Sequence, residues 1–287
     1  MATMKDFRTK NKPTWCPGCG DFTVLAALQK AVVELGLEPE QVALVSGIGC
    51  SGKISQYFNS YGFHSLHGRS LPMATGVKLA NQDLTVIAAG GDGDGYGIGM
   101  GHFVHTVRRN IDITYIVMDN HIYGLTTGQT SPTSERGFRS KTSPQGAAEE
   151  PVKAVETAIV NGASFVAQAF SGDVKQMTQI FKEAISHQGF ALVNCFSPCV
   201  TFNKVNTYEW FKEKLVNVDE LEEYQPEDAD RALRVLAETK GTVTGILYKQ
   251  KRPVYHEVMS GASDVAAAKL DLRLPKEEQQ ALLQSFR

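Results

Sequence analysis

The sequence predicts an α/β fold built on a doubly wound, mostly parallel sheet. Apolar runs of strand length occur at 42–46, 84–89, 113–118, 164–167 and 191–195, and segments of helical length separate most of them. This alternation is typical of parallel strands that helices cover on both faces. In such sheets, ligands bind outside the carboxyl ends of the strands, so we expect a site there.

The helices are predicted from apolar spacing and from the residues at their ends. Asp21 can cap a first helix, apolar side chains share its inner face, and Gly36 can end it. A second helix is expected over 72–81, with proline in its first turn. Two more are expected over 98–109 and 174–186.

The segment 124–151 is long and rich in Gly, Ser, Thr and Gln. A loop of that length is often a lid or an interface, and the alternative is a mobile surface loop. Beyond Cys199 the pattern is mostly helical, and 272–287 reads as a tail. We therefore predict a main domain over 1–200 and an extension over 201–287 that packs on this domain, on a partner subunit, or on both.

Composition limits the classes of partner. The 287 residues carry a formal net charge of −2, which shows no bias toward nucleic acid. Residues 1–15 are polar and basic, unlike a signal peptide. No apolar stretch approaches the roughly 20 residues that span a bilayer. The expectation is a soluble cytoplasmic protein that binds neither nucleic acid nor membrane.

Polar residues follow two of the predicted strands. Asp92 follows the run 84–89 inside a glycine-rich turn, and Asn120 follows the run 113–118. One helical crossover and one strand fit between them, so both side chains are expected at the same sheet edge. Their oxygens suit Mg²⁺, which keeps waters or phosphate oxygens in its remaining positions. Glycines let the backbone approach a phosphate closely. The sequence predicts a Mg²⁺–diphosphate site.

The glycine-rich turn has two competing interpretations. A tight turn whose aspartate caps the next helix would need no ligand. A nicotinamide dinucleotide site would need G-x-G-x-x-G, but Met100 stands at the third glycine's place after Gly95-Tyr96-Gly97. The sequence therefore disfavours a Rossmann dinucleotide site.

Five cysteines in a chain of this kind favour reduced thiols or metal ligation over a disulfide framework. Cys16 and Cys19 form a C-x-x-C pair in a Gly/Pro turn, while Cys50 and Cys199 follow predicted strand ends. Four thiolates suit a zinc ion or a [4Fe–4S] cluster. Cys195 is expected to be a buried strand residue. The alternative is that none of the four binds a metal.

A set of motifs, in order from about residue 10 to 250, resembles the β subunit of 2-oxoacid:ferredoxin oxidoreductases. The motifs are Trp15-Cys16-Pro17-Gly18-Cys19-Gly20, Gly47-Ile48-Gly49-Cys50-Ser51-Gly52-Lys53, His67-Gly68-Arg69, Gly91-Asp92-Gly93-Asp94, Asn120-His121-Ile122-Tyr123-Gly124-Leu125-Thr126 and Pro198-Cys199-Val200-Thr201-Phe202-Asn203.

The resemblance implies a thiamine-diphosphate-binding fold, of which this chain carries the diphosphate-binding half with a helical C-terminal extension. It implies Mg²⁺ ligation by Asp92, Asn120 and the Ile122 carbonyl, and [4Fe–4S] ligation by Cys16, Cys19, Cys50 and Cys199. The residues that it places around thiamine diphosphate are Gly49, Cys50, Ser51, His67, Gly91, Asp92, Gly93, Asp94, Asn120, Gly124, Leu125 and Thr126.

The resemblance also places Lys53 and His67 at the reacting end of the cofactor, where they would contact the 2-oxoacid. The alternatives are a solvated helix lysine and a turn histidine whose hydrogen bonds are satisfied within the protein. The implied reaction is oxidative decarboxylation: 2-oxoacid and coenzyme A give acyl-CoA, CO₂ and two electrons for ferredoxin. We expect 2-oxoglutarate rather than pyruvate as substrate.

Only the diphosphate-binding half of a thiamine-diphosphate enzyme is recognisable here. The glutamate that such enzymes use to protonate the aminopyrimidine is therefore expected on an α subunit, and the chain is expected to be active only with it. Two other functions stay open on the residues alone. One is a non-catalytic scaffold subunit that binds zinc, and the other is a subunit of a non-redox thiamine-diphosphate-dependent decarboxylase.

Overall fold

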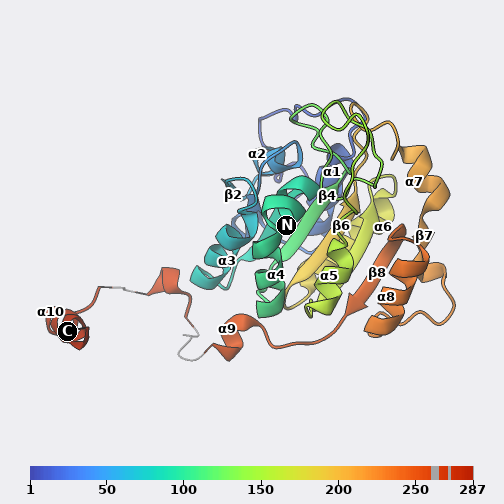
Figure 1. Ribbon diagram of the computed structural model, residues 1–287. Coiled ribbons are helices and arrows are strands. Elements are labelled where there is room, and N and C mark those ends of the chain that lie inside the picture. Colours follow the sequence, from blue (N-terminus) through green and yellow to red (C-terminus); the bar gives the residue numbers. More distant parts are fainter. Residues whose placement is uncertain (260–264, 271–272, 287) are drawn as a thin grey trace.

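One mixed sheet forms the centre of the computed structural model (Figure 1). The structure describes residues 1–259, 265–270 and 273–286. Within those ranges the sheet has eight strands in the order β2-β1-β3-β4-β6-β5-β8-β7. Strands β1 to β6 run parallel, and β8 is antiparallel to β5. The strands are β1 (Val42–Ser46), β2 (Tyr61–His64), β3 (Thr85–Gly91), β4 (Thr114–Asp119), β5 (Phe165–Phe170), β6 (Ala191–Phe196), β7 (Val216–Asn217) and β8 (Val243–Lys249).

Helices cover both faces of this sheet. The α-helices are α1 (Asp21–Glu34), α2 (Ile54–Tyr57), α3 (Ser70–Ala80), α4 (Met100–Arg109), α5 (Ala154–Val160), α6 (Val174–Ser186), α7 (Tyr208–Lys214), α8 (Ala229–Glu238), α9 (Tyr255–Val258) and α10 (Lys276–Ser285). Short 3₁₀ turns are η1 (Pro39–Gln41), η2 (Ser51–Lys53), η4 (Val218–Glu220) and η5 (Ala267–Lys269), and η3 (Gly93–Ile98) is a π-helical turn.

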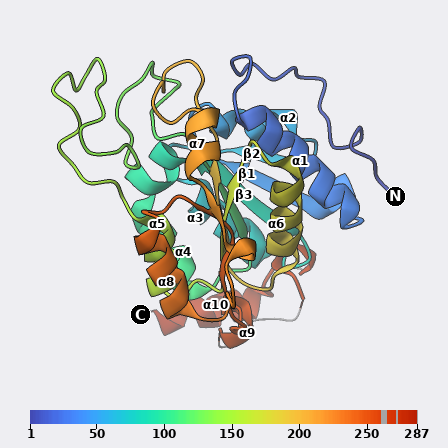
Figure 2. The ribbon, with the colours of Figure 1, turned by 90° about the vertical axis from the view of Figure 1, so that its right-hand side faces the viewer.

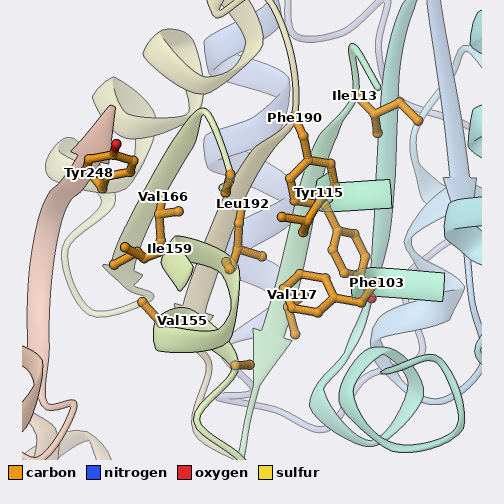
Figure 3. Close-up of a cluster of buried hydrophobic side chains, with 14 of the residues drawn as sticks. Phe103, Ile113, Tyr115, Val117, Val155, Ile159, Val166, Phe190, Leu192 and Tyr248 are labelled. Carbon is orange, nitrogen blue, oxygen red and sulfur yellow. The ribbon is translucent and has the colours of Figure 1, made fainter. Parts of the chain in front are cut away.

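Two apolar cores, one on each face of the sheet, pack the helices against it. One core joins the sheet to α3, α4, α5 and α8, and the other joins it to α1, α2 and α6. Figure 2 shows α1 and α6 on one side of the sheet and α4, α5 and α8 on the other. In the first core Phe103 of α4 packs against Tyr115 of β4 and Phe190 (Figure 3). Burial on both faces explains why the central strands are continuous apolar runs.

The strand register brings the predicted site residues to one edge. Gly91 pairs with Met118, and Met118 pairs with Cys195, so the chain leaves β3, β4 and β6 at nearly the same level. Asp92, Asn120 and Ser197 therefore begin three neighbouring loops. Figure 1 shows the long loop after β4 arching over this end of the sheet.

The predicted parallel α/β sheet is confirmed, and most of its elements are too. The strand over 42–46 and the helix over 174–186 match β1 and α6 in their bounds. The expected capping role of Asp21 is wrong. Gly20 precedes α1 and Asp21 is its first residue, with a buried carboxylate that accepts a hydrogen bond from Ser197 Oγ at 2.7 Å.

The expectation of a mostly helical chain beyond Cys199 needs correction. Although α7 and α8 lie there, β7 and β8 extend the sheet, so residues 216–249 belong partly to its core. Of the predicted tail over 272–287, residues 272 and 287 lie outside the described residues. Helix α10 has no buried residue, and Figure 1 shows it apart from the sheet. In the described ranges, no helix is long and apolar enough to cross a membrane.

Candidate active site

Two buried carboxylates share one hydroxyl at the carboxyl edge of the sheet. Thr133 Oγ1 lies 2.7 Å from Asp92 Oδ2 and 2.8 Å from Asp119 Oδ1. A hydroxyl has one proton, so it can donate to only one of them at a time. Burial, and then the charge of Asp119, raise the pKa of Asp92. Two carboxylates this close in a dry site are stabilised by a proton or by a cation.

Asn120 is held in place by its own turn and by a distant loop. Its side-chain oxygen accepts a hydrogen bond from Ile122 N at 3.1 Å and keeps a second lone pair free. Its carbonyl accepts one from Asn203 Nδ2 at 3.0 Å. His121, between Asn120 and Ile122, adopts φ 57°, in the left-handed region, which bends the chain sharply. Asn203 therefore links the loop that carries Cys199 to the loop that carries Asn120.

The glycine-rich turn after β3 is packed so closely that side chains would not fit. A Cβ at Gly93 would lie 2.1 Å from the Tyr123 ring, and one at Gly47 would lie 1.8 Å from Asp94 Oδ2. Tyr123 in turn donates its hydroxyl to the Gly93 carbonyl at 3.0 Å. The π-helical geometry over Gly93–Ile98 fits this compression, and such turns are frequent at functional sites.

Asp94 holds two other loops through one carboxylate oxygen. Its Oδ1 accepts hydrogen bonds from Ile48 N at 2.9 Å and from Gly68 N at 2.8 Å. The same oxygen lies 2.8 Å from His67 Nδ1. The contact of Asp94 with the diphosphate therefore stays a prediction, because the bonds that the structure shows are to protein.

The pairing with Asp94 fixes the ring of His67. When Nδ1 donates to a carboxylate, Nε2 is left as the group that can meet a ligand. The His67 side chain is 40% exposed, so this nitrogen is not sealed in the core. The Tyr123 ring stands edge-on to it, with centroids 6.4 Å apart. His67 is thus oriented so that Nε2 can meet a ligand.

The remaining predicted contacts lie on the rim. Lys53 ends η2 and is half-buried, and its Nζ donates to Thr14 Oγ1 at 3.3 Å. Leu125 and Thr126 are exposed, and Thr126 bonds to Gln129 within the loop. Ser51 is buried, and a Cβ at Gly91 would lie 3.1 Å from its hydroxyl.

Four thiols gather beside this site. A Cβ at Gly124 would lie 3.4 Å from Cys199 Sγ and 3.9 Å from Cys50 Sγ. Burial is the main cause that raises the pKa of Cys19, and the charges of Asp21, Cys199 and Cys50 add to it. Burial likewise raises the pKa of Cys50 to about 11, with smaller contributions from Asp21, Cys199 and Cys16.

The cysteines thus come together as the spacing predicts, but ligation stays a prediction. In the part of the chain that the structure describes, no three His, Cys, Asp or Glu side chains form a ready metal site. Cys195 is confirmed as a buried strand residue of β6.

Cation and cluster can be tested against the donor chemistry. Asp92 is 2% exposed beside a second carboxylate, and hard oxygen donors with excess negative charge fit Mg²⁺. Four thiols brought together from three turns fit a metal centre that binds four thiolates. The residues present therefore fit both groups.

A cavity of about 570 Å³ adjoins the site and shares residues with it. It is lined by Asp119, His121 and Thr133 but by neither Asp92 nor Asn120. Among its lining residues, Tyr96 donates to Asn194 Oδ1 at 2.9 Å, and Asn194 donates to Asp119 Oδ2 at 3.2 Å. These three side chains therefore hydrogen-bond to one another, while the buried Nε2 of His121, also in the lining, has no hydrogen-bond partner in the described part of the chain.

The sequence does not indicate Thr133 or Asn203 as parts of the site, and it gives Asp119 no role. Asp119 precedes Asn120 at a strand end, which is a usable signal. Thr133 lies in the long loop among other Ser and Thr residues, where nothing distinguishes it.

Comparison with known proteins gives concordant matches over both parts of the chain. Residues 47–195 match the family model "Thiamine pyrophosphate enzyme, C-terminal TPP binding domain". Residues 199–264 match the model of the C-terminal part of the pyruvate ferredoxin oxidoreductase beta subunit. The 2-oxoacid:ferredoxin oxidoreductase subunit beta of Sulfolobus sp is 48% identical over 74% of this chain and 70% of its own length.

Two further relatives agree. A 2-oxoglutarate synthase subunit of Archaeoglobus fulgidus is 41% identical over 77% of this chain and 85% of its own length. The solved 2-oxoglutarate:ferredoxin oxidoreductase from Magnetococcus marinus, with 2-oxoglutarate, coenzyme A and succinyl-CoA bound, superposes with a TM-score of 0.88 at 38% identity. That alignment covers 98% of this chain and 96% of the matched chain.

Proposed function

This chain belongs to the β subunits of the 2-oxoacid:ferredoxin oxidoreductases, and from that premise we propose how its residues serve the reaction. It binds Mg²⁺–thiamine diphosphate and one [4Fe–4S] cluster at the same sheet edge. With an α subunit it converts 2-oxoglutarate and coenzyme A to succinyl-CoA and CO₂, and two electrons pass to ferredoxin.

The observation that carries this proposal is the pair of buried carboxylates bridged by Thr133. Asp92 and Asp119 concentrate negative charge where no protein cation is in hydrogen-bond contact with Asp92 among the described residues. A divalent cation bound by Asp92, Asn120 and the Ile122 carbonyl would neutralise that charge. Such a cation would also bind the diphosphate, and Gly91 and Gly93 let the turn pack closely beneath the site against Ser51 and Tyr123.

Thiamine diphosphate, when bound, supplies a nucleophilic carbon and an electron sink for decarboxylation. The chain's own residues bind and orient it. Ser51, Gly91 and the Gly124–Thr126 segment line the diphosphate. Asp94 supports the site indirectly, because its carboxylate holds the 47–49 and 67–68 loops through hydrogen bonds to their backbone.

A [4Fe–4S] cluster accepts electrons one at a time. Cys16, Cys19, Cys50 and Cys199 would hold it, and Gly124 lies beside two of these thiols, Cys50 and Cys199. Because Asn203 bonds to the Asn120 carbonyl, the two cofactors share one framework.

Several observations favour 2-oxoglutarate as the 2-oxoacid. Two of the relatives named above carry 2-oxoglutarate in their names, and one of these is a solved structure that contains it. Lys53 carries a cationic group on the rim of the site, which suits a second carboxylate. The rest of the pocket would come from the α subunit, together with the glutamate that protonates the aminopyrimidine.

Co-purification with an α subunit under anaerobic conditions tests this function. We expect reduction of methyl viologen that requires both coenzyme A and 2-oxoglutarate, with pyruvate much slower. Asp92→Asn should abolish turnover and the rise in melting temperature that Mg²⁺ and thiamine diphosphate cause.

Two results would contradict the proposal. Full activity of the Asp92→Asn enzyme would show that Asp92 does not bind the metal. A content of one zinc and no iron per chain would contradict the redox function and favour a scaffold role.

A further inference from the structure

The Cys16 turn lies on the surface, at the end of a strap made by residues 8–15. Thr9 Oγ1 and Asn11 Nδ2 donate to the Gln56 carbonyl at 2.8 and 3.2 Å. Thr14 N donates to the Tyr57 hydroxyl at 3.1 Å. The strap is therefore fixed along α2, and its charged side chains project from a defined backbone.

The strap is anchored to the loop of Cys50 as well. Trp15 is buried, and its indole nitrogen donates to the Cys50 carbonyl at 2.7 Å. Its ring packs edge-on against Tyr57 and Phe22, with centroids 4.9 and 5.3 Å apart. Cys16 itself is exposed. One thiol that we assign to the cluster is therefore exposed on this surface, and the loop of a second is bonded to the strap.

This surface is strongly basic in a chain whose net charge is −2. Residues 1–20 contain four Lys or Arg and one acidic residue, Asp6, whose carboxylate accepts hydrogen bonds from Thr3. Arg8, Lys10 and Lys12 are exposed, and they take part in no ion pair that the described residues form.

A further basic side chain, Lys204, comes to this surface from the loop after Cys199. A Cβ at Gly18 would lie 3.7 Å from Val200, so the Cys16 turn touches the loop after Cys199. Lys204 of that loop is exposed and donates to the Val200 carbonyl. Phe22 and Phe202 add apolar surface, at 38% and 37% exposure.

We propose that this surface, formed by Arg8, Lys10, Lys12, Cys16, Phe22 and Lys204, is where the acidic ferredoxin docks to collect electrons. The proposal rests on the proposed function, which supplies the cluster and the acceptor, and adds the place and the residues. We name it the Cys16 surface.

The arrangement suits a transient redox partner. Such encounters use small interfaces, and complementary charge raises their association rate more than their final affinity. A few apolar side chains inside a basic rim match that pattern, and the exposed cysteine brings the partner close to the electron source. The competing occupant is the α subunit, and the experiment separates the two.

The experiment uses the anaerobic α–β complex and a purified acidic [4Fe–4S] ferredoxin. The test variants are Lys10→Glu/Lys12→Glu and, independently, Lys204→Glu. The control is Arg109→Glu/Arg234→Glu, which makes the same change in charge on α4 and α8, across the sheet from the strap. Binding is measured by titration calorimetry at two ionic strengths, and turnover is measured with ferredoxin and with methyl viologen.

We expect the Lys10→Glu/Lys12→Glu complex to bind ferredoxin about 10-fold more weakly at low salt, an effect that fades as salt screens the charges. Its rate with methyl viologen should stay within about twofold of wild type, because a small acceptor needs no docking surface. The control should match wild type in every measurement.

Three results would overturn the proposal: ferredoxin binding unchanged in both test variants, equal weakening in the control, or failure of the test variants to assemble with the α subunit. A wild-type complex that binds ferredoxin but reduces no viologen from 2-oxoglutarate would instead contradict the proposed function. Since binding is measured without turnover, the two failures can be told apart.

Discussion

Asp94 accepts hydrogen bonds from two loops and orients one imidazole through a single carboxylate oxygen. Its other oxygen is buried and has no hydrogen-bond partner in the described part of the chain. Such a side chain can act on catalysis without touching a substrate, because it decides which nitrogen of His67 faces outward. That role differs from diphosphate binding and can be distinguished from it.

The Asp94→Asn variant should lower kcat about 10- to 100-fold, the usual loss when a group that orients a functional histidine is changed. Affinity for thiamine diphosphate should change little, because the hydrogen bonds that Asp94 makes in the structure are to protein groups. His67→Gln should give a similar loss, and the double variant should be no worse than either single one. Additive losses in that cycle would mean that the two residues act separately.

Gly93 is required by its contact with Tyr123. Gly93→Ala places a methyl group 2.1 Å from that ring, so we expect the turn to shift and Mg²⁺–thiamine diphosphate to lose its effect on melting temperature. Gly101→Ala is the matched control, because nothing lies within 4 Å of its Cβ position and it sits inside α4. It should stabilise the chain by about 0.5–1 kcal/mol. Cofactor binding unchanged in Gly93→Ala would refute the argument.

Some site residues can be predicted from the sequence and others cannot. Asp92 and Asn120 follow buried strands, so their place at the sheet edge depends on local pattern alone. Thr133 reaches Asp92 and Asp119 from a loop with no periodicity, and its position depends on tertiary contacts such as the bond from Ser134 Oγ to the His121 carbonyl at 2.7 Å. Sequence spacing does not encode contacts of that kind.

At the scale of elements, three separate turns supply the thiols: the one before α1, the one after β1 and the one after β6. Replacing Cys16, Cys19, Cys50 or Cys199 by Ser should each remove most of the bound iron and the brown absorbance, since a four-thiolate site needs all its ligands. Cys195→Ala is the control and should keep the iron, because Cys195 is buried within β6. Iron and sulfide analysis of anaerobic protein checks both. Iron retained in all four Ser variants would exclude these residues as ligands.

Element prediction from sequence succeeds where burial is continuous and fails at the margins. β1 and α6 follow directly from their apolar patterns. The sequence does not predict β2, because all four of its residues are exposed and no alternation marks it. It does not predict β8 either, because Gly245 interrupts the apolar run, at φ 113° and beside a register shift in the pairing with β5.

At the scale of the molecule, an exposed apolar surface flanks the site. Tyr61 and Phe63 of the edge strand β2 are exposed, as are Leu66, Met73 and Ile98 nearby in the fold. Patches of this kind mark interaction sites, and an unpaired edge strand is a hazard unless something covers it. A partner that completes the cofactor site would cover it.

We therefore expect the α subunit to protect the backbone amides of residues 61–67 from hydrogen exchange, because the amides of an uncovered edge exchange readily. The isolated chain should show no turnover of 2-oxoglutarate even with Mg²⁺ and thiamine diphosphate added. Mass spectrometry with and without the α subunit makes the comparison, and the amides of the buried strand β6 serve as internal reference. Turnover by the isolated chain, or unchanged exchange at 61–67, would contradict this arrangement.

The strand order has a consequence for how the chain is made. β6 lies between β4 and β5, so β5 has no pairing with β4 and waits for residues 191–196. During synthesis the half that ends at β4 can form early, while β5 keeps two unpaired edges until the ribosome has released β6. A nascent chain that contains β5 but not yet β6 therefore exposes the most unpaired strand edge to chaperones. The sheet edge that carries the site is completed only after β6 has paired.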